Sequence, residues 1–334
     1  MSAPGRPKGE FRSAQHEGSQ VTSTVVFRQA GNNLRLGNTL VWVAPAHEWC
    51  RRHGFEFHFP AARRVLGGLL RADSALLQTP AGFAPAAQAT AADQPADDLA
   101  LVDAVLTRML TAAAELGPRL GSDNGVVSLV PLALGCVAHG RGIDWDEASL
   151  VEFVRAHRVC IVNEPLPFRQ RQPVPPDVLG ALLAPAPAVS SMIEALAAAP
   201  GLAFGLHVRQ TDYKRWSGGK FYRDNDFYNA LLARTLSALP ARCSVLVAHD
   251  GEFVADQNVA ADARVRVSAG AESDVVADFV RLAMCDVVLG PQSTFTTQAH
   301  KLGHQWHPKQ RDMVRLLPES SVDDLIHAIQ SRLR

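Results

Sequence analysis

Hydrophobic positions along the chain fall into two alternating patterns, short continuous runs and runs with helical spacing. The short runs, several of them rich in β-branched residues, predict strands at 21–27, 55–59, 126–134, 158–162, 202–207, 244–248, 265–267 and 286–289. The helical spacing predicts helices at 40–52, 97–116, 147–157, 177–183, 190–199, 226–239, 251–260, 273–284 and 323–333, with a loop and helix over 290–302. Strands that alternate with helices are typical of an α/β fold with parallel sheets.

A cluster of prolines divides this pattern into two units. Seven prolines lie between positions 165 and 187, a density that neither a sheet interior nor a long helix tolerates. A chain of 334 residues is also long enough for two domains of ordinary size. The predicted organisation is a disordered tail at 1–20, an α/β domain at 21–164, a proline-rich linker and helix at 165–200, a second α/β domain at 201–318 and a C-terminal helix at 319–334.

Composition narrows the class of protein. The 33 Lys and Arg residues balance the 33 Asp and Glu residues, so bulk charge gives no reason to expect a nucleic-acid partner. The five cysteines are odd in number and widely spaced, which predicts free thiols in a reducing compartment. The chain contains no run of about 20 apolar residues, so neither a signal peptide nor an integral membrane segment is predicted. We therefore expect a cytoplasmic protein, in solution or at the surface of the inner membrane.

Polar side chains gather where the apolar run 201–206 ends. His207, Arg209 and Asp212 follow that run at once. In open α/β sheets, ligands bind in the crevice at the carboxyl ends of the strands. An arginine in that crevice offers a planar fork of donors that matches a diphosphate. The alternative is a strand that runs into a solvated turn, in which Arg209 and Asp212 only pair with each other.

Three segments resemble one enzyme family. The segment 207–213, His-Val-Arg-Gln-Thr-Asp-Tyr, resembles the signature of the inverting α-1,2- and α-1,6-fucosyltransferases, whose superfamily includes the protein O-fucosyltransferases. The segment 31–38, Gly-Asn-Asn-Leu-Arg-Leu-Gly-Asn, resembles the Gly-Leu-Gly-Asn opening loop of the bacterial α-1,2 enzymes. The segment 278–298 resembles the last motif of the family and ends in Ser-Thr-Phe-Thr-Thr-Gln. The order of the three segments is that of the family.

This resemblance implies a fold and an activity. The fold is α/β of the GT-B type, with two Rossmann-like domains that face a cleft and the acceptor side in the first domain. The activity is metal-independent transfer of fucose, with inversion, from GDP-fucose to a cell-surface or secreted glycan. The partners are thus a nucleotide sugar and a glycan acceptor, and no cofactor is needed beyond the donor. The lack of a membrane anchor favours a bacterial member. Residues 291–297, Pro-Gln-Ser-Thr-Phe-Thr-Thr, depart from the α-1,2 pattern and leave the linkage open.

The resemblance also implies roles for individual residues. Arg209 is expected to hold the β-phosphate as it departs, His207 to lie near the guanosine, and Asp278 to accept from the donor groups of guanine. Hydroxyls and free backbone amides at the start of a helix suit phosphate. The other residues expected to bind the nucleotide sugar are therefore Ser293, Thr294, Thr296 and Thr297. Asn32, Asn33 and Asn38 are expected to line the cleft. The alternatives are a surface acid for Asp278, simple N-capping for the hydroxyls, and a tight turn for the glycines of 31–38.

The general base is not evident. The α-1,6 enzymes carry a glutamate ten residues beyond the motif histidine, and Ser217 occupies that position here. Asp212 is the nearest candidate base, with Asp224 and Asp226 behind it, although Asp212 is equally suited to be a structural partner of Arg209. The missing acid favours a second hypothesis, a catalytically silent relative that binds a nucleotide or a glycan. A third is a transferase that uses a different nucleotide sugar.

Two further motifs have open or weak interpretations. Trp216 begins an aromatic, glycine-bearing stretch that is either a sugar-stacking lid or a packed excursion. His300, His304 and His307 have a spacing seen in zinc sites, but no cysteine or acid joins them, so no metal site is predicted.

Overall fold

The computed structural model describes residues 23–28, 35–78, 126–129, 134–137, 147–157, 159–163, 174–251, 253–268, 274–307 and 311–332. Several sequence predictions lie outside these ranges. They are the disordered tail at 1–20, the helix at 97–116, and the cleft residues Asn32 and Asn33.

The first sheet has five strands in the order β2-β1-β5-β4-β3. The strands are β1 (Thr24–Arg28), β2 (Glu56–His58), β3 (Val126–Leu129), β4 (Leu134–Val137) and β5 (Val159–Asn163). All neighbours are parallel except β3 and β4, which are antiparallel. The prediction of one strand at 126–134 was therefore wrong. Apolar residues continue from one strand into the next, so hydrophobicity alone does not reveal where the chain reverses.

The second sheet is parallel throughout, in the order β10-β9-β6-β7-β8. Its strands are β6 (Leu202–Val208), β7 (Cys243–His249), β8 (Val265–Val267), β9 (Val287–Pro291) and β10 (Asp312–Leu316). The inner strands are buried on both faces, which is why they read as continuous apolar runs. The hydrophobic pattern did not predict β10, an edge strand in which exposed Arg315 interrupts buried Val314 and Leu316.

Helices connect the strands and cover the sheets. They are α1 (Leu36–His53), α2 (Ala62–Leu66), α4 (Glu147–Arg155), α5 (Pro176–Leu182), α6 (Pro187–Ala198), α7 (Asn225–Ala238), α8 (Gln257–Ala261), α9 (Val275–Ala283), α10 (Thr294–Trp306) and α11 (Val322–Arg332), with single 3₁₀ turns η2 (Ala75–Leu77) and η8 (Trp216–Gly219). Gly54 ends α1 in a left-handed conformation, as the sequence predicts. No helix in the described ranges is both long and apolar enough to cross a bilayer.

The helix predicted at 251–260 begins six residues late, at Gln257. The cause is a side chain from a neighbouring helix. Asn229 of α7 donates from Nδ2 to the Val254 carbonyl at 3.0 Å and accepts from the Asp256 amide at 2.9 Å. These bonds satisfy backbone groups that a helix would otherwise use, so the segment stays irregular.

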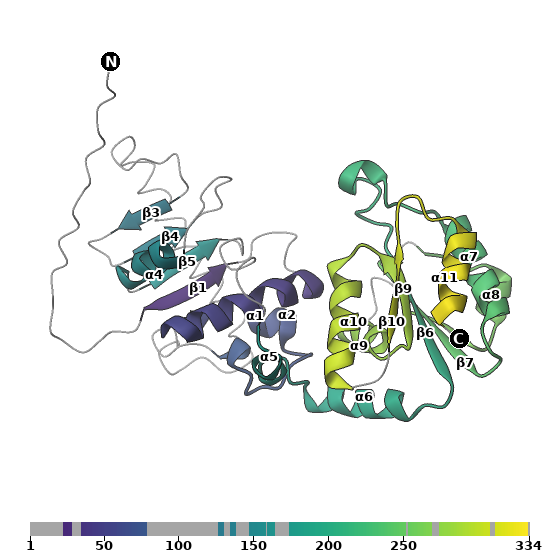
Figure 1. The fold of residues 1–334 in the computed structure, drawn as a ribbon, viewed down its shortest axis with the longest axis horizontal. Helices are drawn as coiled ribbons and strands as arrows, with labels where there is room; N and C mark the ends of the chain where they lie inside the picture. The colour runs from purple at the N-terminus through teal and green to yellow at the C-terminus, as the bar shows by residue number, and fades with distance from the viewer. Residues whose placement is uncertain are drawn as a thin grey trace, which may run out of the picture.

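The second sheet is the middle of three layers (Figure 1), with α9 and α10 on one face and α7, α8 and α11 on the other. Alternate residues of β7 serve the two layers. Leu246 and Ala248 join the core beneath α9 and α10, whereas Val245 and Val247 join the core beneath α7 and α11. The structure is thus mixed α/β with parallel sheets.

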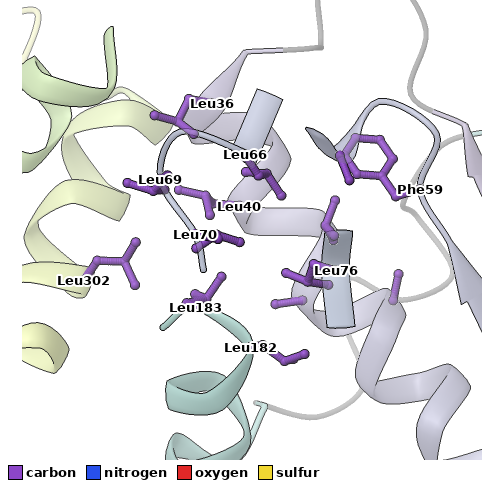
Figure 2. Close-up of a cluster of buried hydrophobic side chains, with 14 of the residues drawn as sticks. Leu36, Leu40, Phe59, Leu66, Leu69, Leu70, Leu76, Leu182, Leu183 and Leu302 are labelled. Atoms are coloured by element: carbon purple, nitrogen blue, oxygen red, sulfur yellow. The ribbon is translucent and has the colours of Figure 1, made fainter. Parts of the chain in front are cut away.

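A continuous hydrophobic core joins the N-terminal helices to α10. Figure 2 shows leucines from several elements converging, among them Leu40 of α1, Leu66 of α2, Leu182 of α5 and Leu302 of α10. Residues 174–200, placed in the predicted linker, supply α5 and α6 to this core. The packing of α1 against α10 brings distant segments of the chain to one pocket. The domain boundaries stay predictions.

Candidate functional site

A pocket of about 660 Å³ lies where β6 and β7 end and where α1, α9 and α10 begin. Its lining residues are Arg35, Leu36, Gly37, Asn38, Arg64, Val65, His207, Arg209, Thr211, Ala248, His249, Asp250, Val275, Val276, Asp278, Thr294 and Phe295. The volume is in the range of small-molecule sites. The carboxyl ends of neighbouring parallel strands meet at one edge of a sheet, and this edge carries the polar residues that the sequence analysis singled out.

His207 is the last but one residue of β6 and is buried in the pocket wall. Its Nδ1 lies 2.6 Å from Oγ1 of Thr296, and its ring centroid is 5.1 Å from that of Phe295. Burial, together with the charge of Arg209, lowers the pKa of His207 to about 4. The imidazole is therefore neutral at pH 7 and offers a hydrogen-bonding edge rather than a charge.

Arg209 follows β6 and its guanidinium is held from three sides. Nε and Nη2 donate to Oδ1 and Oδ2 of Asp212 at 2.9 and 2.6 Å. Nη1 donates to Oγ of Ser293 at 3.2 Å, and the guanidinium lies 4.7 Å from the centroid of the Tyr213 ring. The side chain is only 16% exposed. Arg209 is thus an oriented cation at the pocket wall, and its pairing with Asp212 is part of that orientation.

Asp212 is shared by two arginines. Besides the paired bonds from Arg209, its Oδ2 accepts from Nη1 of Arg35 at 2.9 Å, although the two residues are 177 positions apart. Burial raises the pKa of Asp212, but the bonds and charges of Arg209 and Arg35 outweigh that effect and hold the pKa below its usual value. A carboxylate in this state is a weak proton acceptor. The geometry therefore favours its second predicted role, as the partner that orients Arg209.

The start of α10 supplies hydroxyls to the same region. Ser293 is the N-cap residue, and its Oγ accepts from the Phe295 amide at 3.2 Å. Thr294 donates from Oγ1 to Oδ1 of Asn38 at 2.6 Å. Thr297 does not line the pocket, and its amide donates to the Ser293 carbonyl within the helix. Ser293, Thr294 and Thr296 therefore contact pocket residues, while Thr297 serves the helix.

Gly37 explains how the first turns of α1 and α10 meet. A Cβ atom at Gly37 would lie 2.5 Å from the amide nitrogen and 2.6 Å from Cα of Phe295. No side chain fits at that distance from backbone. The glycine therefore serves a close helix contact rather than a tight turn alone. Both helix starts line the pocket, and each leaves backbone N–H groups without helical partners.

Asp278 lies in the first turn of α9 and is buried at the pocket. Its Oδ1 accepts from Nη1 of Arg281 at 3.1 Å. Ala248, His249, Val275 and Val276 line the pocket with it and add apolar surface. The position is not that of an ordinary helix-surface acid.

Asp250 was not expected from the sequence. Its carboxylate accepts from the amide of Gln210 at 3.1 Å, and from the amide and hydroxyl of Thr211 at 3.0 and 2.6 Å. These bonds hold the backbone that follows Arg209. The signal was present, because Asp250 follows the apolar run of β7 just as Arg209 follows that of β6. Arg35 and Arg64 also line the pocket. Arg35 lies in the segment 31–38 but was not expected to have a role there, and Arg64 had no comparable signal.

The other candidate acids and histidines lie elsewhere. Asp224 caps α7 by accepting from the Phe227 amide at 2.9 Å, and exposed Asp226 follows it in the first turn. Neither residue lines the pocket, and Ser217 does not line it either. The rings of His300 and His304 pack with centroids 4.7 Å apart. In the part of the chain that the structure covers, no three His, Cys, Asp or Glu residues are grouped as metal ligands.

Comparison with known proteins identifies the fold. No family model matches the sequence, and no curated protein sequence matches it. POFUT1 in complex with GDP-fucose superimposes with a TM-score of 0.52 at 10% identity, over 90% of this chain and 99% of that one. POFUT1 in complex with GDP gives 0.50 at 11% identity, over 89% and 99%. NodZ α-1,6-fucosyltransferase with GDP gives 0.38 at 16% identity, over 84% and 92%, too weak a likeness to support an argument. The chain therefore has a fucosyltransferase-like fold.

Proposed function

We propose that this protein is a glycosyltransferase that moves fucose from GDP-fucose to a glycan acceptor. The observation that carries the proposal is the oriented guanidinium of Arg209 beside the first turn of α10. A cationic fork and a helix start together form a site for a diphosphate. The fold supports the choice of donor, because POFUT1 was solved with GDP-fucose. In this proposal, the pocket belongs to a GT-B cleft between the domains 21–164 and 201–318.

The side chains that line the pocket indicate how the nucleotide sugar would bind in this proposal. The diphosphate lies between Arg209 and the start of α10, where the cation and the free amides are. The base lies on the apolar surface of Val275 and Val276, with Asp278 accepting from the paired donors of guanine. The sugar then lies toward Asn38 and Arg35. Arg35 also contacts Asp212, so it connects the position of the sugar with the Arg209–Asp212 pair at the diphosphate.

The reaction breaks the bond between C1 of the sugar and the β-phosphate oxygen. The electron pair stays on GDP, and Arg209 stabilises the charge that develops there. The acceptor hydroxyl attacks C1 from the opposite face, forms the new C1–O bond with inversion, and releases its proton to water. Bond breaking that runs ahead of attack leaves a cation-like sugar, which needs little help from a base. Such a path does not need a strong base, and it therefore suits a site in which Arg209 and Arg35 make Asp212 a weak proton acceptor.

A silent nucleotide-binding relative is the second candidate, favoured by Ser217 in place of the family's glutamate. Release of GDP from GDP-fucose separates the two. The transferase is expected to release GDP slowly to water and faster once a suitable acceptor is added. A protein that binds GDP tightly but releases none from GDP-fucose would be the silent relative.

GDP is expected to raise the melting temperature in the presence of EDTA, because Arg209 and the start of α10 supply the positive charge. At a hundredfold excess over Kd, binding to the folded state alone adds about 2.7 kcal/mol to the free energy of unfolding. GMP, which lacks the β-phosphate, is the control and should give a smaller shift. A shift that appears only with added Mg²⁺ would contradict metal-independent binding.

Changing Asp278 to Ala is expected to weaken GDP binding by about tenfold or more, because a hydrogen bond to a charged group contributes about 1.5–3 kcal/mol. UDP lacks the paired donors of guanine, so the affinity for UDP should change little. Arg281→Ala is the matched control, because it removes the partner of Asp278 and keeps the carboxylate. Titration calorimetry with both nucleotides measures the effect. Equal losses for GDP and UDP would remove Asp278 from the base site and would favour a different donor.

A further inference from the structure

An aromatic cluster stands beside the pocket on the loop between β6 and α7. Trp216 stacks on Tyr213 with ring centroids 5.0 Å apart and an interplanar angle of 18°. Phe221 packs 5.0 Å from Trp216 on the same cluster. Tyr213 and Phe221 are buried, whereas Trp216 is 45% exposed. The loop is thus a packed support that leaves one large aromatic ring at the surface.

The cluster adjoins Arg209, the phosphate-binding residue of the proposed function, through one of its members, Tyr213. The ring of Tyr213 lies beneath the guanidinium of Arg209, and its hydroxyl donates to the Gln292 carbonyl at 2.7 Å. The amide of Trp216 donates to the carbonyl of Asp212 at 2.9 Å. The indole is therefore separated from Arg209 by a single aromatic ring. Through this stack, the surface at Trp216 adjoins the pocket wall at Arg209.

The backbone after Trp216 is held in an unusual conformation. Ser217, Gly218 and Gly219 have φ values of 53°, 70° and 76°, three left-handed residues in succession. Ser217 carries a side chain in this region, which costs about 1–2 kcal/mol. The turn brings the chain back onto Tyr213 and Phe221. Strain of this kind persists where the surrounding packing enforces it, and such sites are frequently functional.

The surface around Trp216 is positively charged. Lys214, Arg215 and Lys220 are exposed within four positions of the tryptophan, and Lys220 Nζ lies 5.0 Å from the centroid of the Phe221 ring. The two acids of the loop do not offset Arg215 and Lys220, because Asp212 binds Arg209 and Asp224 caps α7. In the part of the chain that the structure covers, no carboxylate pairs with Arg215 or Lys220.

We propose that this aromatic platform, Trp216 with Arg215 and Lys220, binds an acceptor saccharide that carries a negative charge. The apolar face of a sugar ring stacks on the indole, and the flanking cations hold a carboxylate or phosphate group of the same glycan. The inference rests on the proposed function, since it names the acceptor class of that site. It assigns to the loop the role of acceptor selection, separate from donor binding.

Titration calorimetry with three oligosaccharides tests the proposal. The probes are tetragalacturonate, pentamannose 6-phosphate and neutral maltotetraose, each added to protein saturated with GDP. We expect at least one anionic probe to bind about tenfold more tightly than the neutral one, because Arg215 and Lys220 are both exposed and an exposed ion pair contributes up to about 1 kcal/mol. The carboxylate and phosphate probes distinguish the two sources of charge. Equal binding of charged and neutral probes, or binding of none, would overturn the proposal.

Variants place the binding on the platform. Trp216→Ala and Arg215→Ala are each expected to weaken the anionic probe about fivefold or more, while the GDP-induced rise in melting temperature is unchanged. Arg234→Ala is the matched control, because exposed Arg234 pairs with Asp323 on the far layer of α7 and α11. Full affinity in both platform variants would overturn the proposal. A wild-type protein whose melting temperature does not rise with GDP would instead contradict the proposed function.

Discussion

Changing Arg209 to Lys is expected to lower kcat for release of GDP from GDP-fucose by about a hundredfold or more. The lysine keeps a positive charge but loses the planar fork that Asp212 aligns. Charge develops on the β-phosphate as the C1–O bond breaks, so the contact with Arg209 is strongest in the transition state. Removing one such preorganised donor costs about 3 kcal/mol in the barrier. KM should change less than kcat, since the ground state retains the positive charge.

The measurement is steady-state release of GDP, with a melting curve on the same sample. The fold should survive, because Arg209 belongs to neither hydrophobic core cluster and Ser293 keeps its capping bond to the Phe295 amide. Arg234→Lys is a matched control, because it makes the same substitution at an exposed ion pair away from the pocket. Near-normal turnover in Arg209→Lys, or a loss explained by unfolding, would mean that another group stabilises the leaving diphosphate.

Changing Gly37 to Ala is expected to destabilise the fold by about 3 kcal/mol, the upper part of the range for overpacked sites. The new methyl group would lie 2.5 Å from a backbone atom of Phe295, and backbone cannot move aside as the end of a flexible side chain can. The starts of α1 and α10 must then separate. Separation would also break the bond from Thr294 to Asn38, so GDP should bind more weakly to the molecules that remain folded.

Urea denaturation measures the first effect, and calorimetry below the unfolding transition measures the second. Gly68→Ala is the matched control. A Cβ atom at Gly68 meets only a Val276 methyl group at 3.5 Å, an ordinary contact, and its φ is not in the left-handed region. Gly37→Ala with wild-type stability and GDP affinity would show that α1 and α10 do not need to approach so closely.

Much of the second sheet and its site follows from local pattern. The run 202–207 ends in His207, and Arg209 follows two positions later. Both line the pocket, because the carboxyl end of a buried parallel strand is where ligands bind. The Arg209–Asp212 pair of the alternative interpretation forms, and Arg209 lines the pocket. The binding of a diphosphate by Arg209 stays a prediction.

Other features had no local signal. The edge strand β10 was missed because Arg315 interrupts its short apolar pattern. The hairpin β3–β4 was read as one strand, since a run of apolar residues does not show a reversal. The late start of α8 depends on Asn229, a side chain about 25 positions earlier in the chain. In each case the deciding contact lies outside the window in which periodicity is measured.

The sequence by itself determined the elements whose causes are local: the buried strand that ends just before Arg209, the helix stop at Gly54 and the N-cap at Ser293. Only the tertiary structure decided which of these elements meet. Arg35 contacts Asp212, which lies 177 positions away in the sequence. Position 37 must be glycine because the backbone of Phe295, in a helix far along the chain, lies against it. The physical reason is that hydrophobic periodicity reports which side of an element is buried, whereas the site depends on which buried sides pack together.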